Sequence, residues 1–179
     1  MTRLFALTAL SLAVHGFAGT VRAQEADEAG TITARVRGTF QDRTAGLGVV
    51  SGDMTIVRFE IRSGELTAVA KIVGAMADSA GNVLGPVDHE VIVPVANVAS
   101  TCNQLRMDLG AADADLLGNA VHFDAQVAGY DSRNGAIPKA LGVLCAAGEL
   151  LRTKPSPASV ANALNGIVAE IRPKPSVSR

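Results

Sequence analysis

The stretch Thr31–Phe40, TITARVRGTF, alternates apolar or small residues with polar and charged ones. Its even-numbered positions are Ile32, Ala34, Val36, Gly38 and Phe40, and its odd-numbered positions are threonines and arginines. Successive side chains of a β-strand point to opposite faces, so this pattern predicts a strand with one buried and one solvent-facing side. A β-rich first half is therefore the starting expectation.

The same alternation continues along the chain as far as Val127, with turn sequences between the runs. We expect Gln41–Asp53 to be a glycine-containing loop. The apolar run after it changes phase near Ile56-Val57, which indicates a β-bulge, and Pro94 favours an edge strand or a bulge. The predicted strands cover 54–61, 66–77, 87–95, 105–109 and 121–127, and the predicted turns are Ser63-Gly64, Asp78–Asn82 and Tyr130–Gly135.

The period changes after residue 135. Apolar residues at helical spacing from Ile137 to Leu151 predict one helix, with Pro138 in its first turn. A second helix is predicted from Val160 to Ile171, capped by Ser156-Pro157 and ended by Pro173. The opposite, less apolar face of this second helix comprises Ser159, Ala161, Asn162, Asn165, Ala169 and Glu170. It carries no basic residue, so packing on the domain or a partner is favoured over a membrane surface.

These elements predict an α+β, mostly-β fold. We expect an antiparallel meander sheet followed by two C-terminal helices. The sheet could remain open or curl into a sandwich or partial barrel. Many small aliphatic side chains could then line an apolar cavity, although a solid core is the favoured interpretation.

The N-terminus has the pattern of an export signal. Arg3 precedes an apolar run from Leu4 to Val14, and Val21-Arg22-Ala23 offers a cleavage site. We predict a signal peptide over 1–23, one exported domain over 24–172 and a disordered tail over 173–179. The protein is then periplasmic or extracellular.

Charge and composition exclude several partners. The chain has 16 Lys+Arg and 17 Asp+Glu, and removal of Arg3 and Arg22 leaves 14 basic against the same 17 acidic residues. A weakly acidic surface does not attract nucleic acid. Apolar runs are too short for an integral membrane protein. The remaining aromatic residues, Phe40, Phe59, Phe123 and Tyr130, are too few for a typical sugar platform or base-stacking surface.

Two cysteines remain in the predicted mature chain, Cys102 and Cys145. An even count in an oxidising compartment predicts one structural disulfide. Distant paired thiols fit neither a zinc site nor a Cys-x-x-Cys redox motif.

The segment Cys102–Gly118, CNQLRMDLGAADADLLG, resembles a signature of small exported bacterial proteins. In that family a Cys precedes L-x-L-D-L-G-x-x-D-x-D-L-L-G, followed by a hydrophobic strand and a Gly/Leu-rich helix with a second Cys. Members are sometimes labelled transporter-associated solute-binding proteins. This chain departs from the pattern at Ala111 and Ala112. The resemblance implies export and a disulfide, and it supplies no catalytic residue.

Asp108, Asp113 and Asp115 are the candidate metal ligands. Ca²⁺ prefers several oxygen ligands from a short loop, but this spacing lacks the order of an EF-hand. Turn and strand-end chemistry between Gly110 and Gly118 is the favoured interpretation.

Other catalytic patterns are weak. His89, between Asp88 and Glu90, and His122, beside Asp124, are too few for zinc. The predicted mature region also lacks the G-x-S-x-G and S-x-x-K motifs of serine nucleophiles.

We therefore expect a non-enzymatic exported domain with a structural or binding role and no cofactor. The partner would be a protein or a small apolar ligand. The alternative is a solute- or apolar-ligand-binding protein associated with an envelope transporter, and a carboxylate-dependent hydrolase ranks last.

Overall fold

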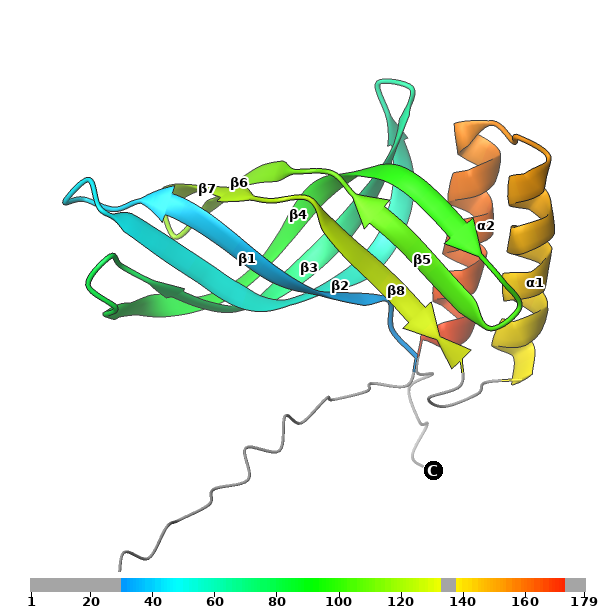
Figure 1. The fold of residues 1–179 in the computed structure, drawn as a ribbon, viewed down its shortest axis with the longest axis horizontal. Coiled ribbons are helices and arrows are strands. Elements are labelled where there is room, and N and C mark those ends of the chain that lie inside the picture. Colours follow the sequence, from blue (N-terminus) through cyan, green and yellow to red (C-terminus); the bar gives the residue numbers. More distant parts are fainter. Residues whose placement is uncertain (1–29, 133–137, 173–179) are drawn as a thin grey trace, which may run out of the picture.

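The computed structural model describes residues 30–132 and 138–172, and it is mostly β with two C-terminal helices, as predicted (Figure 1). The predicted signal peptide, the tail and the end of the Tyr130–Gly135 turn lie outside these residues. The strands are β1 (Thr33–Gln41), β2 (Leu47–Arg62), β3 (Glu65–Ala77), β4 (Val83–Ser100), β5 (Gln104–Leu109), β6 (Ala112–Leu116), β7 (Asn119–Phe123) and β8 (Gln126–Asp131). The helices are α1 (Pro138–Arg152) and α2 (Pro157–Ile171).

The sheet closes on itself. Its order is β2-β3-β4-β5-β8-β1-β7-β6, and an additional antiparallel pairing joins β1 to β2. The ring β1-β2-β3-β4-β5-β8 is therefore a six-stranded antiparallel barrel, and the β6–β7 hairpin extends its wall through the pairing of β7 with β1. Of the shapes compatible with the sequence, the barrel is the one adopted.

The expected loop at Gln41–Asp53 is wrong, because β2 already begins at Leu47. Glycines obscured the alternation there. Gly48 lies under the ring of Phe40, its partner on β1, so a Cβ at this position would collide with that ring. Gly52 faces Gly74 of β3 backbone to backbone, where a side chain would also collide. Small residues here let neighbouring strands and rings approach closely.

The bulge in β2 is confirmed. The register with β3 shifts between Ile56 and Arg58, so that Ile56 and Phe59 are both buried, each with 3% of its surface exposed. A second phase change separates β7 from β8 at residues 124 and 125. Val127 was expected on the face of Phe123, but it is 49% exposed. Tyr130, expected in a turn, is a buried residue of β8.

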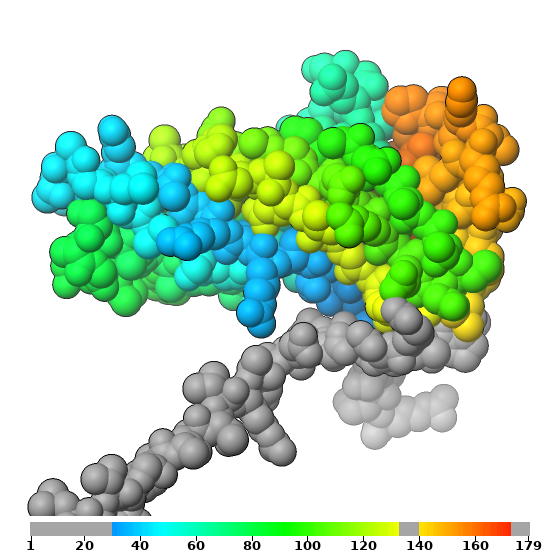
Figure 2. All heavy atoms as spheres, viewed as in Figure 1, coloured from blue at the N-terminus to red at the C-terminus, as the bar shows by residue number. Residues whose placement is uncertain are grey.

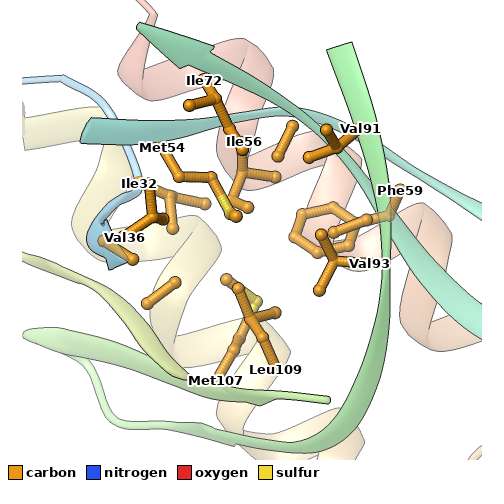
Figure 3. Close-up of a cluster of buried hydrophobic side chains, with 14 of the residues drawn as sticks. Ile32, Val36, Met54, Ile56, Phe59, Ile72, Val91, Val93, Met107 and Leu109 are labelled. Atoms are coloured by element: carbon orange, nitrogen blue, oxygen red, sulfur yellow. The ribbon is translucent and has the colours of Figure 1, made fainter. Parts of the chain in front are cut away.

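Side chains from opposite walls meet inside the barrel (Figure 3). Met54 and Ile72 come from β2 and β3, and Met107 points inward from β5 on the other side; each is at most 1% exposed. These contacts form one continuous hydrophobic cluster that includes both helices. The inward-facing side chains of this cluster are mainly aliphatic.

Helix α2 covers the edge of β2 that β1 leaves free. The pairing of β1 with β2 ends at Thr33 and Thr55. Beyond it, the Asn165 side chain accepts a hydrogen bond from the Phe59 N–H at 2.8 Å and donates to the Phe59 carbonyl at 2.9 Å. Arg172 donates to the carbonyl of Val57 at 2.9 Å. Asn165, expected on the outer face, thus replaces a neighbouring strand.

Ala161 was also expected on the outer face of α2, but it is buried at 5% exposure. A small apolar side chain is compatible with either face of an amphipathic helix. Among the described residues, the helices fall short of the length and hydrophobicity that crossing a bilayer requires.

Helix α1 is fastened to the end of β4. The Ser100 hydroxyl donates to the carbonyl of Leu144 at 3.1 Å. Gly148 approaches the Ser100 carbonyl so closely that a Cβ would lie 2.9 Å from its oxygen. The disulfide Cys102–Cys145 lies beside these contacts, with 4.1 Å between the two Cα atoms.

The chain enters and leaves the described fold at one place. A small crevice is lined by Gly30–Ile32 on the entering side and by Val168, Ile171 and Arg172 on the leaving side. Both ends therefore lie close together.

Candidate binding groove

Three turns meet at the end of the barrel opposite the helices. The β1–β2 turn and the β3–β4 turn lie side by side there, at the left of Figure 2. The β6–β7 turn joins them across the start of β4, where the Leu117 side chain lies 3.3 Å from the position that a Cβ on Gly85 would occupy. We call this the turn end of the barrel.

Asp42 builds the first turn and ties it to the second. One carboxylate oxygen accepts hydrogen bonds from the N–H groups of Thr44 and Gly46, at 2.8 and 2.9 Å, and from the Thr44 hydroxyl. The other accepts from the N–H of Ser79 at 2.9 Å, in the neighbouring turn. Asp42 therefore holds two turns that are 37 residues apart in the sequence.

Asp78 stabilises the second turn in the same way. Its carboxylate accepts hydrogen bonds from the backbone N–H groups of Ala80 and Asn82, at 3.0 and 2.8 Å, and from the Asn82 side chain at 2.9 Å. Aspartates that cap their own turns are common where the backbone leaves donors unpaired.

These hydrogen bonds keep both carboxylates ionised. Those from Ser79, and then those from Thr44, hold the pKa of Asp42 well below its ordinary value. Hydrogen bonds from Asn82 lower the pKa of Asp78, although the nearby charge of Asp42 acts in the opposite direction. Both groups are therefore acceptors at neutral pH.

A groove of about 440 Å³ lies between the three turns. Asp42, Arg43, Thr44 and Asp78 line one side, and Leu84 with Leu117, Gly118 and Asn119 lines the other. Two large apolar side chains of this lining are exposed, Leu84 at 47% and Leu117 at 57%. Leu47 and Val83, the first residues of β2 and β4, are 65% and 74% exposed. Clustered exposed apolar side chains of this kind mark interaction sites.

The sequence candidates for calcium do not converge. Asp108 accepts a hydrogen bond from Asn97 on β4 at 3.2 Å, Asp113 contacts His122, and Asp115 accepts from the Gly118 N–H of its own turn at 3.1 Å. Residues 30–132 and 138–172 place no three His, Cys, Asp or Glu side chains together as metal ligands. Each of the three aspartates contacts a different neighbour on its own strand, hairpin or turn.

The two histidines of the described residues, His89 and His122, lie on different strands of the barrel wall, β4 and β7. His122 Nδ1 is 2.8 Å from Asp113 and its Nε2 is 3.9 Å from Asp124, on the outer surface. His89 lies on β4, opposite Ile72 of β3, and is exposed. Neither histidine lines the groove.

Two polar atoms inside the barrel have no hydrogen-bond partner among the described residues, Gln126 Oε1 and Tyr130 Oη. Burial raises the pKa of Tyr130, and the charge of Asp131 acts in the same direction. The phenol is therefore neutral at physiological pH.

Sequence reasoning missed the groove because its residues come from separate turns. Asp78 lay in a predicted turn, but Asp42 and Arg43 lay in the expected Gln41–Asp53 loop. The only available signal was the apolar residues beside the turns, such as Leu117, since exposed turns usually carry polar side chains.

The comparisons with known proteins give no relative. No family model, curated protein or solved structure matches this chain.

Proposed function

We propose that this chain is a small exported, non-enzymatic domain that binds a partner in the cell envelope or outside the cell, and that the groove at the turn end is its binding site. The observation that carries the proposal is that two large apolar side chains, Leu84 and Leu117, are exposed in the wall of that groove. Their exposure costs free energy in water, which contact with a partner recovers.

The disulfide supports export. Bonded cysteines persist in oxidising compartments and are rare in the cytosol. We expect the secreted chain to begin near Gln24 and to lack the two thiol hydrogens. Intact-mass spectrometry of the native protein checks both points, and a chain that keeps Met1 and carries two free thiols would contradict export.

The state of the groove carboxylates favours binding over hydrolysis. A carboxylate-dependent hydrolase needs one carboxyl group with a raised pKa to donate a proton. The pKa values of Asp42 and Asp78 are both lowered, and their oxygens accept hydrogen bonds from backbone N–H groups. Their chemistry is that of turn caps.

An apolar solute is the second candidate for the groove, because Leu84 and Leu117 offer it a hydrophobic wall. Titration with the hydrophobic dye ANS tests the site. We expect dye fluorescence to rise on the wild type and to fall by about half or more in the Leu84→Ser, Leu117→Ser double variant, which removes most of the apolar contact.

Val127→Ser is the matched control, since Val127 is 49% exposed on the barrel wall and does not line the groove. It should leave the dye signal unchanged. Equal dye binding by all three proteins would exclude the groove as the apolar site.

A further inference from the structure

The hydrogen-bond ladder on one side of β4 stops at Pro94. β4 pairs with β5 only from Val95 to Ser100, and the Gly110 N–H donates to the Pro94 carbonyl at 2.8 Å. Between Val83 and Pro94, β4 pairs with β3 on its other side. Within residues 30–132 and 138–172, no strand pairs with this part of β4 on the side of Pro94's carbonyl.

The Pro94 carbonyl shows which backbone groups of β4 point to the unpaired side. Alternate residues of a strand direct their backbone groups to the same side. Because the register with β3 is unbroken from Pro86 to Pro94, Asp88, Glu90 and Ile92 direct their N–H and C=O groups to the open edge. The two prolines, which lack an N–H, bracket these three donors.

β6 presents a second unpaired edge, and it lies beside β4 without pairing with it, so a further strand would enter between the two. Among the strands that the structure describes, it pairs with β7 alone, through a turn of two residues, Leu117 and Gly118. The flanking pair Leu116 and Asn119 is the hydrogen-bonded pair of such a hairpin, so the backbone groups of Asp113 and Asp115 point away from β7. β6 follows Gly110 directly, where the ladder with β4 stops, and the β6–β7 turn borders the groove.

The exposure of His89 indicates an opening in the wall at this place. His89 pairs with Ile72, whose side chain is fully buried, so the two share the inner face. Val87 and Val91, on the same face of β4, are 3% and 4% exposed. His89 between them is nevertheless exposed.

Acidic side chains stand on the outer face along both open edges. On β4 these are Asp88 and Glu90, whose side chains are 66% and 56% exposed, with Lys71 at 2.9 Å and Arg58 at 3.8 Å. On β6 they are Asp113, 82% exposed beside His122, and Asp115. Four carboxylates thus stand along the two edges, and Lys71 and Arg58 form ion pairs with two of them, Asp88 and Glu90.

We propose that the partner is an extended, basic polypeptide segment that adds to the open edge of β4 as a further strand, with one end in the groove. Backbone groups of Asp88, Glu90 and Ile92 would pair with it, as in other complexes formed by strand addition. Lysine or arginine at alternate positions faces the carboxylates, and small apolar residues face inward. This inference rests on the proposed function and specifies its partner.

The carboxylates and prolines along these edges also determine which strands can bind. Charged side chains and prolines on an open edge prevent indiscriminate pairing. Carboxylates on both sides repel acidic strands and attract basic ones, so charge selects the partner as well as blocking aggregation.

The test uses the full mature protein and a short, acetylated and amidated peptide in which lysine and valine alternate. We expect saturable binding by fluorescence anisotropy, and slower amide hydrogen exchange at Asp88, Glu90 and Ile92. A peptide with glutamate for lysine should bind at least about tenfold more weakly. A peptide with alternate N-methylated residues cannot form the ladder and should not bind.

Glu90→Pro removes one donor at the open edge, and Glu90→Thr is its matched control because it removes the same charge and keeps the N–H. We expect the proline variant to bind about fivefold more weakly than the threonine variant, the effect of one backbone hydrogen bond. Ile92→Pro against Ile92→Thr is the second pair if the first proline variant does not fold.

Binding of the N-methylated peptide as tightly as of its parent, or unchanged exchange at the three amides, would overturn strand addition. Absence of binding by the lysine–valine peptide would do so as well. In each case the ANS titration would still show independently whether the groove is an apolar binding site. If sedimentation showed that the protein self-associates, the partner at this edge would be a second copy of this chain, and the proposal of a basic peptide would be overturned.

Discussion

Asn165 is the side chain on which the attachment of α2 most depends. Its amide satisfies both backbone groups of Phe59, which would otherwise be part of an unpaired strand edge. An unsatisfied, partly buried backbone group costs about 1–3 kcal/mol. We therefore expect Asn165→Ala to lower the free energy of unfolding by about 2 kcal/mol, measured by urea denaturation.

Asn162→Ala is the control on the same helix, because Asn162 is exposed. It should change the free energy of unfolding by less than about 0.5 kcal/mol. If both variants were equally stable, the hydrogen bonds between Asn165 and Phe59 would contribute nothing, and α2 would be held by its apolar face and by Arg172.

At the scale of elements, Asp42 joins the β1–β2 and β3–β4 turns. A carboxyl group whose pKa is lower in the folded than in the unfolded protein stabilises the fold above the unfolded value, about 4, and loses this contribution as the pH falls towards the folded value. We expect Asp42→Ala to lower the unfolding midpoint temperature at neutral pH, and the difference from wild type to narrow below about pH 4.

Asp124→Ala serves as the comparison, since Asp124 is an exposed carboxylate on the outer wall. Its effect on the midpoint should be small throughout the range. A difference between wild type and Asp42→Ala that stayed constant down to the lowest pH would refute the role of the ionised carboxylate.

Local patterns predicted the elements well where the side chains themselves alternate, as at Ile32–Phe40 and at the bulge beside Ile56. They failed where glycine stood on the inner face: Gly48 and Gly52 have no side chain to register in a hydrophobic pattern, so β2 appeared to begin late. Closure of the ring depends on the pairing of β1 with β2 and with β8, and the second contact is nearly a hundred residues away in sequence. The groove depends on the same closure, so its residues could not be grouped in advance.

At the scale of the molecule, the disulfide Cys102–Cys145 encloses β5 to β8 and the first half of α1 in one covalent loop. A loop of this size, 43 residues, restricts the unfolded chain by about 4 kcal/mol in the chain-entropy model. We expect the Cys102→Ser, Cys145→Ser double variant to lose stability of this order in urea denaturation.

A reducing agent should lower the stability of the wild type towards that of the double variant and leave the variant itself unchanged. Equal stability of the oxidised wild type and the double variant would show that Ser100 and Gly148 hold α1 without the covalent bond.

The shared crevice at Gly30 and Ile171 has a consequence for the order in which the chain runs. A short linker across this crevice could join Arg172 to Gly30, which would make the backbone of the described fold cyclic. Opening the cyclic chain at the exposed Ser63-Gly64 turn would give a circular permutant, and we expect it to keep the barrel, the disulfide and the groove. The pairing of the strands around the barrel would then determine the fold, whichever turn carries the chain ends.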